Sequence, residues 1–275
     1  MTKLYNTDDL KDFLEDLYYK FNRRQYAHPD PLEFLYGYPD IKDREIVGLL
    51  ASSLAYGRVA QILKSVSAVL AKMDKAPFDF ILNSTGKSLE KTFSRFVHRF
   101  AKQEHLCGFL LGIKQVLVKY GSLYKCFSAG MEKTSENILP ALIFFSGEII
   151  KYAGKDPGHL MPLPSNGSAS KRLNLFLRWM VRKDRVDPGG WDKIATSKLI
   201  IPLDVHMYKL SKVLKFTERK QANLKTAIEI TNCFKKFAPD DPVKYDFALT
   251  RFGIRKDFDF NGFVGNINLI DKNKE

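Results

Sequence analysis

The chain has 275 residues, of which 45% are hydrophobic, and its formal net charge is +13. The apolar content excludes an intrinsically disordered protein, and the length is sufficient for one large folded unit or two small ones. The positive charge indicates an anionic partner, either nucleic acid or an anionic membrane surface, although a basic protein without such a partner has the same composition.

Membrane-spanning and secreted proteins are disfavoured by the apolar pattern. No stretch approaches the ~20 unbroken apolar residues that cross a bilayer. Residues 1–21 contain several acids and lack the apolar segment of a signal peptide. We therefore expect a cytoplasmic protein with no membrane contact.

Metal chemistry is equally disfavoured. The three cysteines, Cys107, Cys126 and Cys233, are far apart and form no CxxC pair. Neither a disulfide framework nor a structural zinc or iron–sulfur site is expected from this spacing. The histidines are dispersed and form no HD or HExxH pair, so a helical metal-dependent hydrolase is poorly supported. We expect neither a metal nor a cofactor.

Helical periodicity dominates the first half of the chain, and strand signals are scarce. Residues 10–21 place their apolar side chains at helical spacing. A proline-rich loop with one short helical turn is expected over residues 27–43, and two helices follow within residues 44–73. Gly57 interrupts that pattern, so the break is expected near Ala55–Gly57.

Helices are also predicted over residues 106–127, with Gly121 as a C-cap, and over residues 138–154. A loop of Pro, Ser, Asn and Gly at residues 159–170 precedes a helix at 171–183.

Helices are expected to resume at residues 203–214, 224–237 and 241–254, whereas 184–200 and 257–275 are expected to be irregular. The pattern predicts an all-α protein of about ten helices, without repeats or an obvious linker.

Lys171 occupies the predicted first helical turn after the loop. The partial positive charge at a helix N-terminus disfavours an ammonium group there and favours the neutral amine. A neutral amine can attack an electrophilic carbon and form a Schiff base. A solvated first-turn lysine is the simpler interpretation of this position alone.

The loop before Lys171 strengthens the functional interpretation. Asn166, Gly167 and Ser168 can present several backbone N–H groups toward one point, as happens where a phosphate is held at a helix N-terminus. Such a loop next to a lysine suits a DNA backbone whose sugar meets the amine. Arg172 is a further candidate for a backbone contact.

Asp204 lies in the segment "IPLDVHMYKLSKVL", residues 201–214. An aspartate directly before an amphipathic run is most simply a helix N-cap. The cap also fixes its carboxylate near the helix end, so the two roles are compatible.

The same segment resembles the one that carries the catalytic aspartate in helix-hairpin-helix DNA glycosylases. It is closest to the 8-oxoguanine DNA glycosylases, including the archaeal type, where a V-P-V-D-V-H-M type run begins that helix. "PSNGSASKRLNLFLRWM" resembles their hairpin, P-G-x-G-x-K followed by an apolar helix. The resemblance implies that Lys171 and Asp204 are catalytic and that His206 is the family's histidine after the aspartate. The chain as a whole is also similar to a bacterial family of unknown function.

Weaker similarities extend over other helices. "GLLASSLAYGRVAQILKSV" is similar to the helix, loop and helix whose loop fills the gap left by the extruded base. Tyr56 and Arg58 are the candidates for that role, the alternative being a core tyrosine and a surface arginine. "KYDFALTRFGI" resembles the helix that helps to wall the base pocket. Phe247 and Phe252 are candidates to stack on the base, although aromatic side chains at helical spacing are more often core.

The resemblance implies a two-lobed helical bundle of the helix-hairpin-helix DNA glycosylase type. One lobe spans approximately residues 45–165, and the other spans 166–255 plus the N-terminal helices. It also implies a monomeric glycosylase with associated lyase activity that excises an oxidised purine, 8-oxoguanine first, from double-stranded DNA.

Three alternatives stay open. Lys183 and Lys193 are closer in sequence to Asp204 than Lys171 is and are rival nucleophiles. The protein can be a non-catalytic nucleic-acid-binding protein on the same scaffold. It can also be a glycosylase for an alkylated or deaminated base, since the sequence does not define the base pocket.

Overall fold

The computed structural model describes residues 7–255 and 257–272, and most of them are helical. This confirms the prediction of an all-α fold. Strand among the described residues consists of one antiparallel pair, β1 (Val97–His98) and β2 (Ala101–Lys102). The α-helices are α1 (Thr7–Phe21), α2 (Ile41–Ser53), α3 (Val59–Leu70), α4 (Pro77–Asn83), α5 (Gly86–Thr92), α6 (Gln103–Tyr120), α7 (Leu123–Ala129), α8 (Leu139–Tyr152), α9 (Lys171–Val181), α10 (Val205–Val213), α11 (Leu224–Lys235), α12 (Asp246–Ile254) and α13 (Phe260–Lys272).

Two helix breaks lie where glycines predict them, at Gly57 and Gly121. Gly57 has a φ of +98° in the turn between α2 and α3, a conformation that L side chains rarely adopt. Gly121 ends α6 in the left-handed conformation, so its role as a C-cap is confirmed. The proline-rich loop contains a short 3-10 helix, η2 (Pro31–Gly37), which Asp30 caps by accepting a hydrogen bond from the Leu32 N–H.

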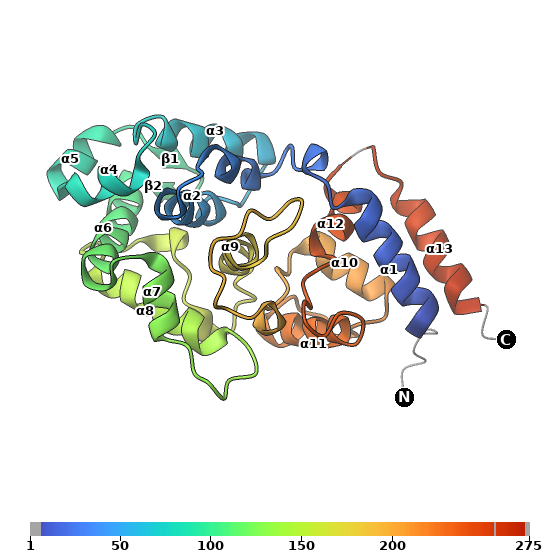
Figure 1. The fold of residues 1–275 in the computed structure, drawn as a ribbon. Coiled ribbons are helices and arrows are strands. Elements are labelled where there is room, and N and C mark those ends of the chain that lie inside the picture. The colour runs from blue at the N-terminus through green and yellow to red at the C-terminus, as the bar shows by residue number, and fades with distance from the viewer. Residues whose placement is uncertain (1–6, 256, 273–275) are drawn as a thin grey trace.

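Helix α9 lies at the centre of the fold (Figure 1). Helices α2–α8 occupy one side of it in that view, and α1 and α10–α13 occupy the other. Every residue of α9 from Leu173 to Val181 is buried. The buried apolar residues form one cluster that extends through both sides. The predicted division into two lobes at residues 45–165 and 166–255 stays a prediction.

The structure differs from the expected element map chiefly in two places, besides the later start of α12 at Asp246 instead of residue 241. The segment between α3 and α6 contains α4, α5 and the β1–β2 hairpin, for which no element was predicted. The prediction of an irregular tail after residue 257 is wrong, because α13 covers most of it. Gly and Asn weaken the helical propensity of that segment. Tertiary packing compensates, since Phe263 of α13 is buried and its ring lies 5.8 Å from that of Phe13 in α1.

No single helix in the described part of the chain is long and apolar enough to cross a membrane. Helices α6 and α7 reach that length and composition only as a pair, and they are bent by 73° at the break between them.

Candidate functional site

A cavity of about 690 Å³ lies where α9 and α10 begin. The turn after α2, the start of α3, the loop leading into η2 and one side of α12 complete its wall. Four of the residues predicted to act in catalysis or DNA binding line it, namely Tyr56, Lys171, Asp204 and His206. The remaining lining residues are Pro29, Asp30, Pro31, Ala55, Gly57, Val59, Ile62, Leu175, Arg178, Pro202, Leu203, Val205, Asp246, Thr250, Arg251, Gly253 and Ile254.

Lys171 is the first residue of α9, as the sequence predicts, and its side chain is half-buried. The preceding Ser170 is held at a φ of +47° and supplies no capping hydrogen bond to the helix. The N-terminus of α9 therefore opens toward the cavity without a side-chain cap from that residue. Among the described residues, no hydrogen bond or ion pair engages the Lys171 amine, so it is available to a ligand.

Asp204 is the N-cap of α10, which confirms that part of its interpretation. Its Oδ1 accepts hydrogen bonds from the backbone N–H groups of His206 and Met207, each at 2.9 Å. No described residue donates a hydrogen bond to Oδ2. One carboxylate oxygen thus holds the side chain in place while the other remains available at the cavity wall, a geometry that suits stabilisation of positive charge.

Tyr56 is fixed at the cavity wall by contacts on both sides. Its hydroxyl donates to the backbone oxygen of His98 at 3.0 Å. The Arg172 guanidinium lies 5.0 Å from the ring centroid and donates a 2.6 Å hydrogen bond to the Ser53 carbonyl oxygen. These contacts tie Tyr56 and Arg172 to the protein, so a wedge role for Tyr56 requires that they be broken.

The structure brings only some of the predicted backbone-binding residues to this region. Asn166, Gly167 and Ser168 are exposed, and Gly167 has a φ of +77°. Ser168 and Arg172 line a smaller adjoining cavity of about 260 Å³, to which Tyr56 and Lys171 also belong. Arg58 is exposed at the start of α3 and lines neither cavity.

The structure does not bring Phe247 and Phe252 together with Lys171 and Asp204. Phe247 is fully buried in the core, and Phe252 packs between Phe21, Phe258 and Phe263 on the opposite side of α12. Neither residue lines the cavity of Lys171 and Asp204. The helical spacing placed both on α12 correctly but did not show which side of that helix faces the cavity.

His206 is half-buried and packs so closely against α12 that a Cβ on Gly253 would overlap its ring. The rival nucleophiles, Lys183 and Lys193, are exposed and do not line the cavity. Among the described residues, Lys171 is therefore the one lysine that lines the same cavity as Asp204.

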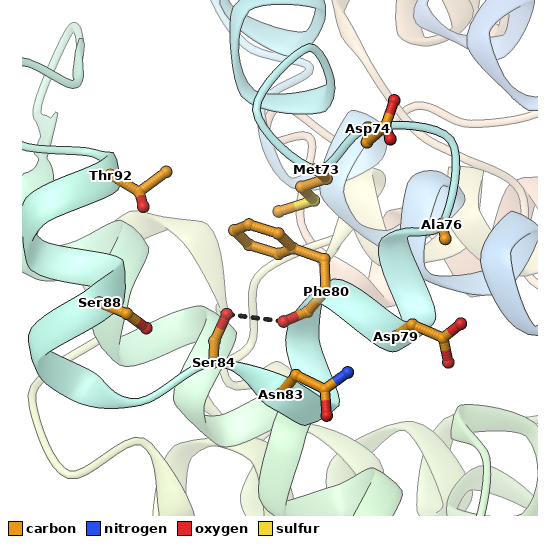
Figure 2. Close-up of a pocket in the computed structure, with 9 residues that line it drawn as sticks. All are labelled: Met73, Asp74, Ala76, Asp79, Phe80, Asn83, Ser84, Ser88 and Thr92. Atoms are coloured by element: carbon orange, nitrogen blue, oxygen red, sulfur yellow. Dashed lines mark hydrogen bonds between the residues drawn. The ribbon is translucent and has the colours of Figure 1, made fainter.

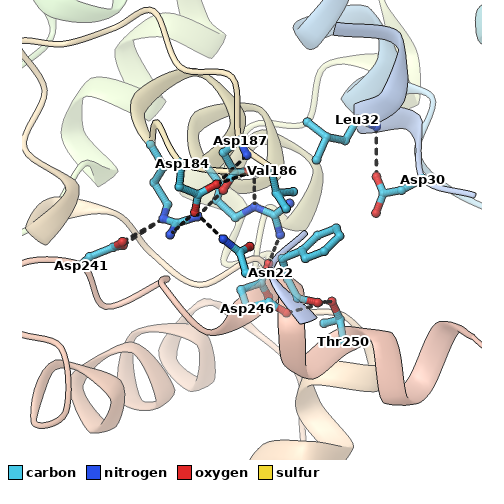
Figure 3. Close-up of polar contacts among 12 residues, drawn as sticks. Asn22, Asp30, Leu32, Asp184, Val186, Asp187, Asp241, Asp246 and Thr250 are labelled. Carbon is cyan, nitrogen blue, oxygen red and sulfur yellow. Dashed lines mark hydrogen bonds and ion pairs between the residues drawn. The ribbon is translucent and has the colours of Figure 1, made fainter. Parts of the chain in front are cut away.

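A buried polar cluster behind Lys171 was not predicted from the sequence. Arg178 of α9 is 2% exposed and pairs with Asp187 at 3.3 Å and with Asp246 of α12. Figure 3 shows polar contacts of Asp184, Asp187, Asp241 and Asp246 in this region. Burial, together with the nearby Asp204, raises the pKa of Asp246 to about 6 against the opposing effect of Arg178. The available signal was an arginine inside the apolar run "LFLRWM".

A separate cavity of about 410 Å³ is formed by α4, α5 and the turn after α3 (Figure 2). Its charged lining residues are the acids Asp74 and Asp79, and no lysine or arginine contributes to it. This electrostatic character is unsuited to a polyanion.

Residues 30–255 match the family described as proteins of unknown function, DUF2400, and the chain therefore belongs to that family. No curated protein and no solved structure matches the chain.

Proposed function

We propose that this member of a family of unknown function is a DNA glycosylase with associated lyase activity, which excises an oxidised purine from double-stranded DNA. One observation carries the proposal: the uncommitted amine of Lys171 and the anchored carboxylate of Asp204 line the same cavity. The resemblance of both segments to helix-hairpin-helix glycosylases and the net charge of +13 support it.

The target base must first leave the duplex, at a cost of a few kcal/mol. Neutral Lys171 Nζ then attacks C1′ of the sugar. The bond from C1′ to the base breaks, and the base leaves with the electron pair and takes up a proton. Asp204 stabilises the positive charge that develops on the sugar.

The lyase step follows from the same covalent bond. The sugar ring opens between C1′ and O4′, O4′ takes up the proton released by the nitrogen, and an imine forms. Removal of a C2′ proton expels the 3′ phosphate and nicks the strand. Water finally hydrolyses the imine and frees Lys171.

Borohydride trapping on a panel of lesion-containing duplexes tests this function. Reduction of the imine leaves the protein covalently attached to DNA, which we expect for an oxidised-purine duplex and not for undamaged duplex. Trapping only with alkylated or deaminated bases would assign a different lesion. Binding without trapping on any duplex would indicate the non-catalytic nucleic-acid-binding protein.

A further inference from the structure

Several polar atoms at the cavity of Lys171 and Asp204 have no partner. Among the described residues, Arg178 Nη2, Asp246 Oδ1 and Arg251 Nε are buried without a hydrogen bond. All three residues contribute to the cavity wall, although each is at most 2% exposed. Unsatisfied buried polar atoms are costly, so a ligand or a buried water is expected to complete them.

The ion pair of Arg178 and Asp246 leaves one donor and one acceptor without a partner. Arg178 Nη1 donates a hydrogen bond to Asp246 Oδ2. Nη2 of the same arginine and Oδ1 of the same aspartate remain without a hydrogen bond. Asp187 holds the guanidinium from the other side through Nε at 3.3 Å. A donor and an acceptor on a fixed pair are complementary to a ligand edge that carries an acceptor beside a donor.

On the basis of the proposed glycosylase function, we propose that Arg178 and Asp246 recognise the cyclic amide edge of the extruded base. Arg178 Nη2 donates to the carbonyl oxygen, and Asp246 Oδ1 accepts from the adjacent ring N–H. A carbonyl oxygen suits the guanidinium and an amide N–H suits the carboxylate, because both hydrogen bonds are then charge-assisted. Oxidised guanine carries such edges, whereas an adenine adduct without a ring N–H beside a carbonyl does not.

Asp246→Asn inverts this pattern with little change in volume. The new amide must turn its carbonyl oxygen toward Arg178 Nη1, which places its NH₂ where Oδ1 was. A donor then opposes the ring N–H of the base. We expect excision of 8-oxoguanine from duplex DNA to fall by about 100-fold, the effect of leaving one buried polar group unpaired.

Asp241→Asn is the matched control. Asp241 belongs to the same network through Arg182, which donates to Asp187 and, from Nε, to Asp241 at 3.1 and 2.9 Å. Asp241 does not line the cavity. We expect this variant to lose stability from the same kind of substitution and to excise 8-oxoguanine at the wild-type rate.

Trapping on a duplex with an abasic site separates this inference from the proposed function. Such a duplex has no base for Arg178 and Asp246 to contact, so we expect wild type and Asp246→Asn to be trapped equally. Equal excision of 8-oxoguanine by both would mean that buried water satisfies these atoms, and loss of abasic trapping in Asp246→Asn would mean a structural role. Either result overturns the inference. If wild type is trapped by no duplex, the proposed function fails and this inference fails with it.

Discussion

Lys171 and Asp204 are each placed at the N-terminal end of a helix, and the two helix ends meet at one cavity. Asp204 is anchored by two backbone hydrogen bonds, whereas the Lys171 amine is held by no described residue. The carboxylate is therefore positioned in advance, and the amine can move to meet a substrate. Pre-organisation of one group and freedom of the other suit a nucleophile that must form and later release a covalent bond.

Lys171→Gln should abolish borohydride trapping and leave the fold intact. The side chain is half-buried and makes no described hydrogen bond or ion pair, so its loss removes chemistry rather than packing. We expect a change in the free energy of unfolding within about 0.5 kcal/mol, measured by urea denaturation. Lys193→Gln is the control, because Lys193 is exposed away from the cavity and this variant should be trapped like wild type.

Two substitutions at Asp204 separate its cap from its chemistry. Asparagine also caps helices, so Asp204→Asn should preserve stability, whereas Asp204→Ala should cost about 1 kcal/mol. Both remove the negative charge and should slow base excision in single-turnover assays. Wild-type excision by Asp204→Asn would reduce Asp204 to a structural cap.

Gly57→Ala tests the turn that borders the cavity. At a φ of +98° an alanine is strained, and its Cβ would lie 2.8 Å from Cδ of Arg99. Gly154→Ala isolates the backbone effect, since Gly154 has a φ of +67° and a Cβ added there would meet nothing within 4 Å. We expect thermal denaturation to show a loss of about 1 kcal/mol for Gly154→Ala and a larger loss for Gly57→Ala. Equal losses would mean that the Arg99 contact is unimportant.

The pH dependence of stability should reflect Glu45 of α2. Burial raises its pKa from 4.5 to about 7, although the N–H groups of Leu123, Tyr124 and Trp191 oppose the shift by donating to its carboxylate. The folded state therefore holds this proton more tightly than the unfolded state. The contribution of Glu45 to the free energy of unfolding is fully present below pH 4.5 and is lost as the pH rises from 4.5 to about 7. The loss is on the order of 2–3 kcal/mol.

Glu45→Gln is the corresponding test, because glutamine does not titrate. Denaturant unfolding of wild type and variant between pH 4.5 and 7 should show a flatter profile for the variant. If the free energy of unfolding of wild type, relative to that of Glu45→Gln, instead increased with pH, the three hydrogen bonds would outweigh burial.

Local patterns in the sequence predicted much of the fold and part of the site. The helix break at Gly57, the first-turn position of Lys171 and the cap at Asp204 each depend on a few neighbouring residues. Long-range packing was not predictable in this way. Arg178 pairs with Asp187 and Asp246, which come from two other segments of the chain. The apolar run around Arg178 therefore did not reveal the polar cluster.

The orientation of α12 could not be predicted from the sequence for the same reason. Periodicity groups side chains on helix faces but does not state which face meets a cavity and which meets the core. Phe247 is buried in the core and Phe252 packs against neighbouring aromatic rings, whereas the cavity side of α12 carries Asp246, Thr250 and Arg251.

The attachment site of trapped DNA identifies the residue that acts as the nucleophile. The protein is incubated with an 8-oxoguanine duplex and borohydride, digested, and sequenced by mass spectrometry to locate the modified residue. We expect the sugar-derived adduct to lie on Lys171, as the proposed function requires. An adduct on Lys183 or Lys193, or no adduct on any lesion duplex, would contradict it.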